Sequence, residues 1–130
     1  MDTDNTRLKR LLDKKRRALK MPKSRLGELE DEYADLLSRI DAERKRLGID
    51  DDTVEAYLSD MESRYKDADV SWLLENTPMW KEQLKRIYRN IRKCTAEGDA
   101  DDYSYYKNRL TVLWNRICTE AHKDRQLSLI

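Results

Sequence analysis

The chain has 130 residues, enough to bury one hydrophobic core but hardly two, so we expect a single helical domain over residues 1–130. Apolar residues make up 38% and charged residues 41% with no Phe, so the core must be built from Leu, Ile, Tyr and three Trp. Three Gly and two Pro are too few for the tight turns of a β-sandwich or a series of hairpins. The composition predicts an all-α protein, a small bundle of about five amphipathic helices.

The net charge of +1 hides a strong segregation of charge along the chain. Residues 1–25 hold 10 Lys and Arg against 3 Asp and Glu, and residues 26–76 hold 6 against 16. Residues 77–97 are basic again, with 6 against 2, and the remainder is balanced at 5 against 5. Such blocks can attract a charged partner, or the basic and acidic helices can neutralise each other.

Export and membrane insertion find no support in the sequence. No stretch approaches about 18 consecutive apolar residues, and the first residues lack the layout of a signal peptide. We therefore expect an intracellular, cytoplasmic protein without a membrane span. We therefore expect Cys94 and Cys118 to be free thiols in a reducing compartment.

The first predicted helix covers residues 6–21 and is basic, with Leu8, Leu11, Leu12 and Leu19 on one side. Pro22 should close it, because proline cannot donate to the helical ladder and disfavours the α conformation in the residue before it.

The second predicted helix, residues 22–47, has the most regular apolar spacing in the chain. A heptad seam with one polar interruption at Glu43 runs through it and is formed by Leu26, Leu29, Tyr33, Leu36, Ile40 and Leu47. This length is the lower limit for a coiled coil. The central seam residues Leu29, Tyr33, Leu36 and Ile40 are either a homodimer contact or part of the core. Gly48 is the expected C-terminal cap.

A third helix is predicted over residues 52–68, because Asp52 and Glu55 have the spacing of a capping box. Its apolar stripe is Val54, Tyr57, Leu58, Met61 and Tyr65. Ser71 is expected to cap only a short turn through residues 72–74.

The last two helices, residues 78–97 and 100–123, are predicted to form an antiparallel hairpin around Gly98, followed by a tail over residues 124–130. Thr77 is the expected cap and Pro78 the first helical residue. The inward stripes are Trp80, Leu84, Ile87, Tyr88 and Ile91, then Tyr103, Tyr106, Leu110, Leu113, Trp114, Ile117 and Ala121.

Catalytic chemistry has no candidate residues. His122 lies four residues after Cys118 on a predicted helix, but Cys94 should lie about 20 Å from Cys118 in the hairpin, so no zinc site is expected. No phosphate-binding loop, nucleophile elbow or Glu-x-x-His pattern is present. We expect a non-enzyme without catalytic residues, metal or cofactor.

Two basic surfaces are candidates for binding a partner. The first, the basic ridge, consists of Lys81, Lys85, Arg89 and Arg92 at about one-turn spacing, opposite the apolar stripe of its helix. The second, on the first helix, includes Arg7, Arg10, Lys14 and Arg17. A rigid ridge loses little entropy on binding, so the ridge is expected to contribute more.

These features predict a non-catalytic helical protein-protein interaction module, such as an adaptor, assembly factor or inhibitor. The first alternative is an accessory protein that binds nucleic acid through its basic helix faces. A third hypothesis is that the acidic block from Glu28 to Glu75 imitates nucleic acid and occupies a basic groove on another protein. Self-association through the heptad seam is also expected.

Overall fold

A computed structural model describes residues 4–20 and 30–128, and every regular element in these two ranges is a helix. The elements are α1 (Asp4–Leu19), α3 (Glu30–Leu47), α4 (Asp51–Glu62), the 3-10 helix η1 (Ser63–Lys66), α5 (Ala68–Asn76), α6 (Pro78–Glu97) and α7 (Ala100–Ser128). The prediction of an all-α helical bundle is therefore confirmed. Pro22, Leu26 and Leu29 lie outside the described residues.

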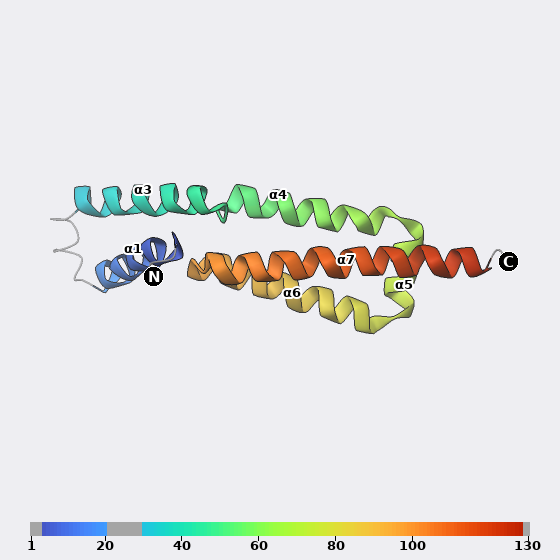
Figure 1. Ribbon diagram of the computed structural model, residues 1–130. Coiled ribbons are helices and arrows are strands. Elements are labelled where there is room, and N and C mark those ends of the chain that lie inside the picture. Colours follow the sequence, from blue (N-terminus) through green and yellow to red (C-terminus); the bar gives the residue numbers. More distant parts are fainter. Residues whose placement is uncertain (1–3, 21–29, 129–130) are drawn as a thin grey trace.

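The helices form an elongated bundle (Figure 1). The long helix α7 has α4 along one side and α6 along the other, and α3 extends beyond the start of α7, where it lies beside α1. Helix α6 packs antiparallel to α7, as predicted for the C-terminal hairpin. Helix α1 packs along α3, and α5 packs against α7 near the end of the molecule where the C-terminus lies.

Two glycines end helices as predicted. Gly48 and Gly98 have φ angles of 71° and 73°, in the left-handed region that glycine enters without a steric penalty. Gly98 also lies close to α1, because a Cβ placed there would collide with Leu12 and crowd Leu8. This glycine therefore serves both the turn into α7 and the packing of α1 against that turn.

The start of α4 differs from the capping box predicted at Asp52. The helix begins one residue earlier, so Asp50 is the cap, and its carboxylate accepts hydrogen bonds from the backbone N–H and the hydroxyl of Thr53. Asp52 instead lies in the first turn, where its charge complements the helix dipole.

The third predicted helix, residues 52–68, was too long, and the turn predicted after it is a helix. Helix α4 ends at Glu62 and continues as η1, and α5 follows as a nine-residue helix. Asp67, not Ser71, caps α5 by accepting from the backbone N–H groups of Asp69 and Val70. The predicted tail was also wrong in part, because α7 extends to Ser128 through residues without Gly or Pro.

Most residues of the predicted apolar stripes are in the core, although Leu19 is 59% and Tyr65 is 39% exposed, and Ile49 and Val70 join the core from outside those stripes. The fully buried members of the core, all less than 2% exposed, are Leu8, Ile49, Leu58, Val70, Leu84, Ile91, Leu110, Trp114 and Ile117. Trp114 packs edge-on against Tyr65 at 5.0 Å, and its Nε1 donates to the Tyr88 hydroxyl at 3.0 Å. Burial raises the pKa of Tyr88 to about 12, so this hydroxyl stays protonated.

The described part of the heptad seam faces α1. Ile40 is buried and Leu36 packs against the core, while Leu8 and Leu11 are buried from the α1 side. The polar interruption Glu43 is also buried and forms ion pairs with Arg7 of α1 at 3.3 Å and with Arg46 at 2.8 Å. The hydrogen bond from Arg46 lowers the pKa of Glu43 and so keeps this carboxylate charged on the seam.

Candidate functional site

A groove of about 410 Å³ runs between α6 and α7 on the outer side of the hairpin. We call it the α6–α7 groove, and it is lined by Gln83, Ile87, Tyr105, Asn108, Arg109, Val112, Leu113 and Arg116. Ile87 and Leu113 are buried and form its floor, while most of the other lining side chains are exposed. The groove therefore combines an apolar floor with an open, mixed rim.

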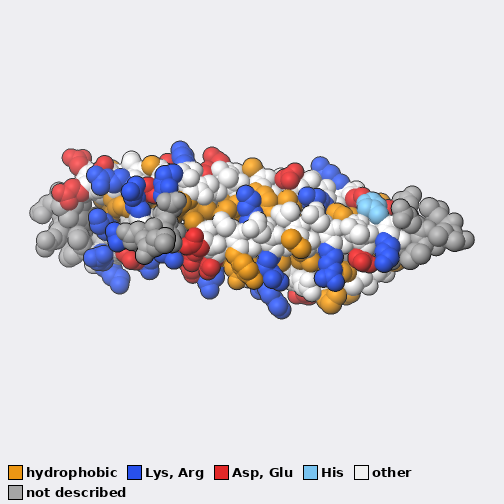
Figure 2. Space-filling view, in the orientation of Figure 1, with side chains coloured by type: hydrophobic (Ala, Val, Ile, Leu, Met, Phe, Trp, Pro, Cys, Tyr) orange, Lys and Arg blue, Asp and Glu red, His pale blue; other side chains and the backbone are white. Residues whose placement is uncertain are grey.

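The α7 side of this groove exposes large apolar side chains. Tyr105 is 54% exposed and Val112 is 66% exposed, the highest value among the exposed large apolar residues of the described chain. The two residues are seven positions apart, so they lie on one face of the helix. Figure 2 shows hydrophobic and Lys or Arg side chains interleaved over the region where Figure 1 places α6 and α7.

Two arginines on the same face of α7 have no acidic partner among the residues that the structure describes. Arg109 Nη1 donates to the Tyr105 hydroxyl at 3.3 Å and its guanidinium lies over that ring. The Arg116 guanidinium lies 5.5 Å above the centre of the Trp80 ring. No carboxylate among the described residues lies within ion-pair distance of either arginine, so both charges are available to a ligand.

The predicted basic ridge lies on the other flank of α6, since Gln83 and Lys85 are two residues apart and so point roughly in opposite directions. All four ridge residues are exposed. Arg92 pairs with Glu55 of α4 at 2.8 Å and Lys85 pairs with Glu82 at 4.0 Å. Lys81 and Arg89 have no carboxylate of the described chain within ion-pair distance. The ridge is thus partly neutralised by the protein itself.

The basic surface of α1 is also partly engaged. Arg7 pairs with Glu43 and Lys9 pairs with Asp99 at 3.5 Å, and the side chains of Arg7, Lys9, Arg10, Lys14 and Arg17 are all exposed. A second cavity of about 640 Å³ lies between α1 and the end of the α6–α7 hairpin, where the side chain of Leu19 is 59% exposed. Its lining is more polar than that of the α6–α7 groove and includes both signs of charge.

Several carboxylates of the acidic block are held in ion pairs by the protein itself, although others, such as Glu30, Asp52 and Asp60, are exposed and in no ion pair with a described residue. Asp35 and Asp41 pair with Arg39 and Lys45 one turn further along α3. Asp51 pairs with Arg44 at 3.0 Å, and Glu43 and Glu55 are held as described above. A mimic of nucleic acid needs carboxylates that a basic partner can reach, so these pairs weaken that hypothesis.

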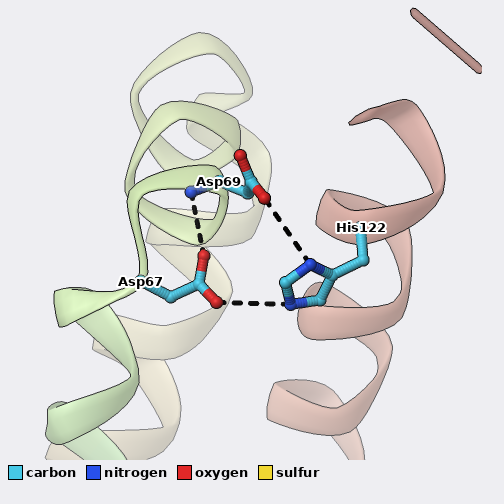
Figure 3. Close-up of side chains that lie close together, drawn as sticks. All are labelled: Asp67, Asp69 and His122. Carbon is cyan, nitrogen blue, oxygen red and sulfur yellow. Dashed lines mark hydrogen bonds and ion pairs between the residues drawn. The ribbon is translucent and has the colours of Figure 1, made fainter. Parts of the chain in front are cut away.

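A cluster of Asp67, Asp69 and His122 joins the start of α5 to α7 (Figure 3). His122 Nε2 lies 3.3 Å from Asp67 Oδ2, and Nδ1 lies 3.6 Å from Asp69 Oδ2. At these distances His122 Nε2 can donate a hydrogen bond to Asp67, and a protonated imidazole is in addition attracted electrostatically to Asp69. The cluster therefore acts as an ion-pair clasp between two helices when His122 is charged.

The same three side chains bring one ligand atom each within 4.8 Å of one another. A structural zinc site takes four ligands, and the other oxygen of Asp67 is already used to cap α5. Cys118 is not part of this cluster, so the structure does not bring it together with His122 as metal ligands. Sequence reasoning missed both aspartates because they lie more than 50 residues before the histidine.

Both cysteines are free thiols in the structure. Cys94 is buried in the last turn of α6 and Cys118 is half-buried in α7. Burial raises the pKa of each thiol, which disfavours the reactive thiolate form. These groups are suited to packing rather than to redox or nucleophilic chemistry.

Comparison with known proteins adds nothing to this geometry: no family model, curated protein or solved structure matches the chain. Among the described residues, no helix has the length and apolar character needed to cross a membrane. The sequence pointed to the basic ridge but not to the α6–α7 groove. The signal was present as Tyr105, Arg109, Val112 and Arg116, a second helical stripe on α7 that alternates apolar and basic side chains.

Proposed function

We propose that this protein is a non-catalytic interaction module that binds a helical segment of another protein in the α6–α7 groove. The observation that carries the proposal is the outer face of α7, where Val112 is 66% exposed between two arginines that pair with no acidic residue in the described part of the chain. Exposed apolar side chains gathered beside a groove are typical of surfaces that bind proteins. A groove between two packed helices also accepts a third helix by the same ridge packing.

A protein ligand explains the groove better than a nucleic acid. Bases bind to exposed aromatic faces by stacking, but arginines already lie over the rings of Tyr105 and Trp80. The centre of the exposed face is aliphatic Val112, and the floor consists of Ile87 and Leu113. These side chains contribute to binding by excluding water from apolar surface, which a partner helix provides and a phosphate backbone does not.

Site-specific photocrosslinking in the cells that naturally make the protein tests this proposal. A benzophenone amino acid at position 112 should yield a discrete adduct of higher mass that nuclease leaves unchanged and in which mass spectrometry finds peptides of a second protein. The matched control carries the same group at Ala56, which is exposed on α4 away from the groove. Equal adducts at both positions, or an adduct that nuclease removes, would contradict the proposal.

The second candidate function is binding of nucleic acid through the basic ridge, and the free charges of Lys81 and Arg89 favour it. Phosphate contacts release counterions, so binding of this kind falls steeply as salt rises. A titration of duplex DNA and of single-stranded RNA between about 50 and 200 mM salt would detect it. If this candidate is correct, Lys81→Glu with Arg89→Glu should abolish binding while Val112→Asp leaves it unchanged.

A further inference from the structure

We infer that the helix held in the α6–α7 groove is acidic and amphipathic, with two carboxylates two turns apart on either side of an apolar residue. This inference rests on the proposed function and specifies the chemistry of its ligand. It follows from the pattern of charge and apolar surface along α7, which fixes what a complementary helix must carry.

The two arginines set the spacing of the carboxylates. Arg109 and Arg116 are seven residues apart, so they lie on one face of α7 and are separated by about 10 Å along the helix axis. A partner helix lying along the groove presents side chains at the same interval when they are seven residues apart. Glu or Asp at positions i and i+7 would therefore reach both guanidinium groups at once.

The apolar part of the ligand is set by the residues between the two arginines. Val112 lies midway between them, and Ile87 and Leu113 form the floor beneath. On a partner helix, positions i+3 and i+4 lie between i and i+7 on the same face. Aliphatic side chains at those positions would cover Val112 and remove it from water.

Carboxylates of the protein itself limit how far the acidic pattern can extend. Helical spacing places Asp102 seven residues before Arg109 and Glu120 four residues after Arg116 on the same flank of α7. Further acidic residues toward either end of the ligand would face like charge. The two acidic positions are therefore confined to the middle of a segment of about three turns.

Three synthetic 18-residue alanine-rich peptides test this pattern against the isotope-labelled full chain by NMR. The acidic peptide carries Glu at i and i+7 with Leu at i+3 and i+4. The basic peptide carries Lys at the same two positions. The rotated peptide has the composition of the acidic one, but its two Glu lie on the opposite face of the helix. Circular dichroism ensures that the three are equally helical.

We expect the acidic peptide to shift the amide resonances of Val112 and its neighbours in the groove. Two exposed ion pairs should make its binding about three- to tenfold tighter than that of either other peptide. The variant Arg109→Glu with Arg116→Glu should reverse the preference in favour of the basic peptide. The matched variant Lys85→Glu with Arg89→Glu changes the same charge on the ridge and should keep the original preference.

Equal binding of the acidic and basic peptides would overturn the inference, and so would shifts confined to the ridge. If all three peptides bind equally and Val112→Asp abolishes binding, the groove binds helices but does not select acidic ones, and the proposed function stands. If no peptide shifts the groove resonances, the inference fails, and the crosslinking experiment at position 112 decides the proposed function separately.

Discussion

Helix α7 has two faces that differ in what covers them. The inner face carries Leu110, Trp114 and Ile117, each 0% exposed and packed among the other helices. The outer face carries Tyr105 and Val112, which are more than half exposed. Arg109 lies between these two residues, and Arg116 lies one turn beyond Val112. Folding of the chain buries the apolar side chains of the inner face, whereas those of the outer face remain in contact with water. Substitutions on the two faces should therefore affect different properties, stability for one and binding for the other.

The largest effect is expected for Trp114→Ala. This substitution removes a fully buried indole and leaves a cavity beside Tyr65 of η1 and Tyr88 of α6, which should lower the free energy of unfolding by about 3–5 kcal/mol. Urea denaturation followed by circular dichroism measures the loss. Val112→Ala is the control on the same helix and should change stability by less than about 0.5 kcal/mol. Comparable losses for both variants would mean that the outer face is also covered.

Alanine substitutions at Gly48 and Gly98, the glycines that end two helices, should cause smaller losses of stability that differ from each other. Both have left-handed backbones, so alanine strains each by about 1 kcal/mol. At Gly48 a Cβ meets nothing within 4 Å, but at Gly98 it collides with Leu12 and crowds the buried Leu8. Gly98→Ala should therefore cost about 1–2 kcal/mol more than Gly48→Ala in thermal denaturation. Equal costs would show that α1 does not pack against the start of α7.

The hydroxyls of Tyr88 and Tyr103 differ in whether they have a hydrogen-bond partner among the described residues. The Tyr88 hydroxyl accepts from Trp114, so Tyr88→Phe leaves a buried indole N–H without a partner and should cost about 1–2 kcal/mol. The Tyr103 hydroxyl is buried, and no described residue hydrogen-bonds to it. Tyr103→Phe should be neutral or slightly stabilising. A loss of stability in the Tyr103 variant equal to that in the Tyr88 variant would contradict this assignment.

The same tyrosines predict how stability depends on alkaline pH. Burial raises the pKa of Tyr57, Tyr65, Tyr88 and Tyr103 above the ordinary value of 10.0, and that of Tyr88 to about 12. The unfolded chain therefore loses these protons at lower pH than the folded chain. The contribution of these protonated hydroxyls to the free energy of unfolding should be fully present below pH 10 and should be lost as the pH rises toward 12. Denaturation at pH 8 to 12 measures the fall, which should be smaller in Tyr88→Phe than in the wild type.

The sequence predicted the inner face of α7 because its apolar residues recur at intervals of three and four. Gly98 and Pro78 marked the ends of α6 for the same local reasons, and the observed bounds agree. Helix α5 could not be predicted as well, because it is short and its cap, Asp67, lies outside the apolar pattern. The ion-pair clasp between Asp67, Asp69 and His122 depends on how α5 packs against α7. The spacing of residues along the sequence carries no information about that tertiary contact.

The candidate groove was missed for a different reason. The neighbours of Val112 one helical turn away are charged or polar (Asn108, Arg109, Asn115 and Arg116), so a search for continuous apolar stripes assigns it to the solvated face. Only the packing of α6 beside it, which supplies the floor residue Ile87, turns this isolated side chain into part of a groove. The basic ridge was found from sequence because its charges are continuous, but the carboxylates that neutralise Lys85 and Arg92 depend partly on tertiary contacts.

Val112→Asp should also change stability very little, and it is the sharpest test of the comparison between the two faces. The side chain is 66% exposed, so a carboxylate there keeps its hydration and lies near Arg109 and Arg116. The free energy of unfolding should stay within about 0.5 kcal/mol of the wild type. Binding of the acidic peptide should nevertheless be lost, because the new charge repels its carboxylates and prevents apolar contact. A variant that loses both stability and binding would place Val112 in the core, and one that keeps both would remove the outer face of α7 from the binding surface.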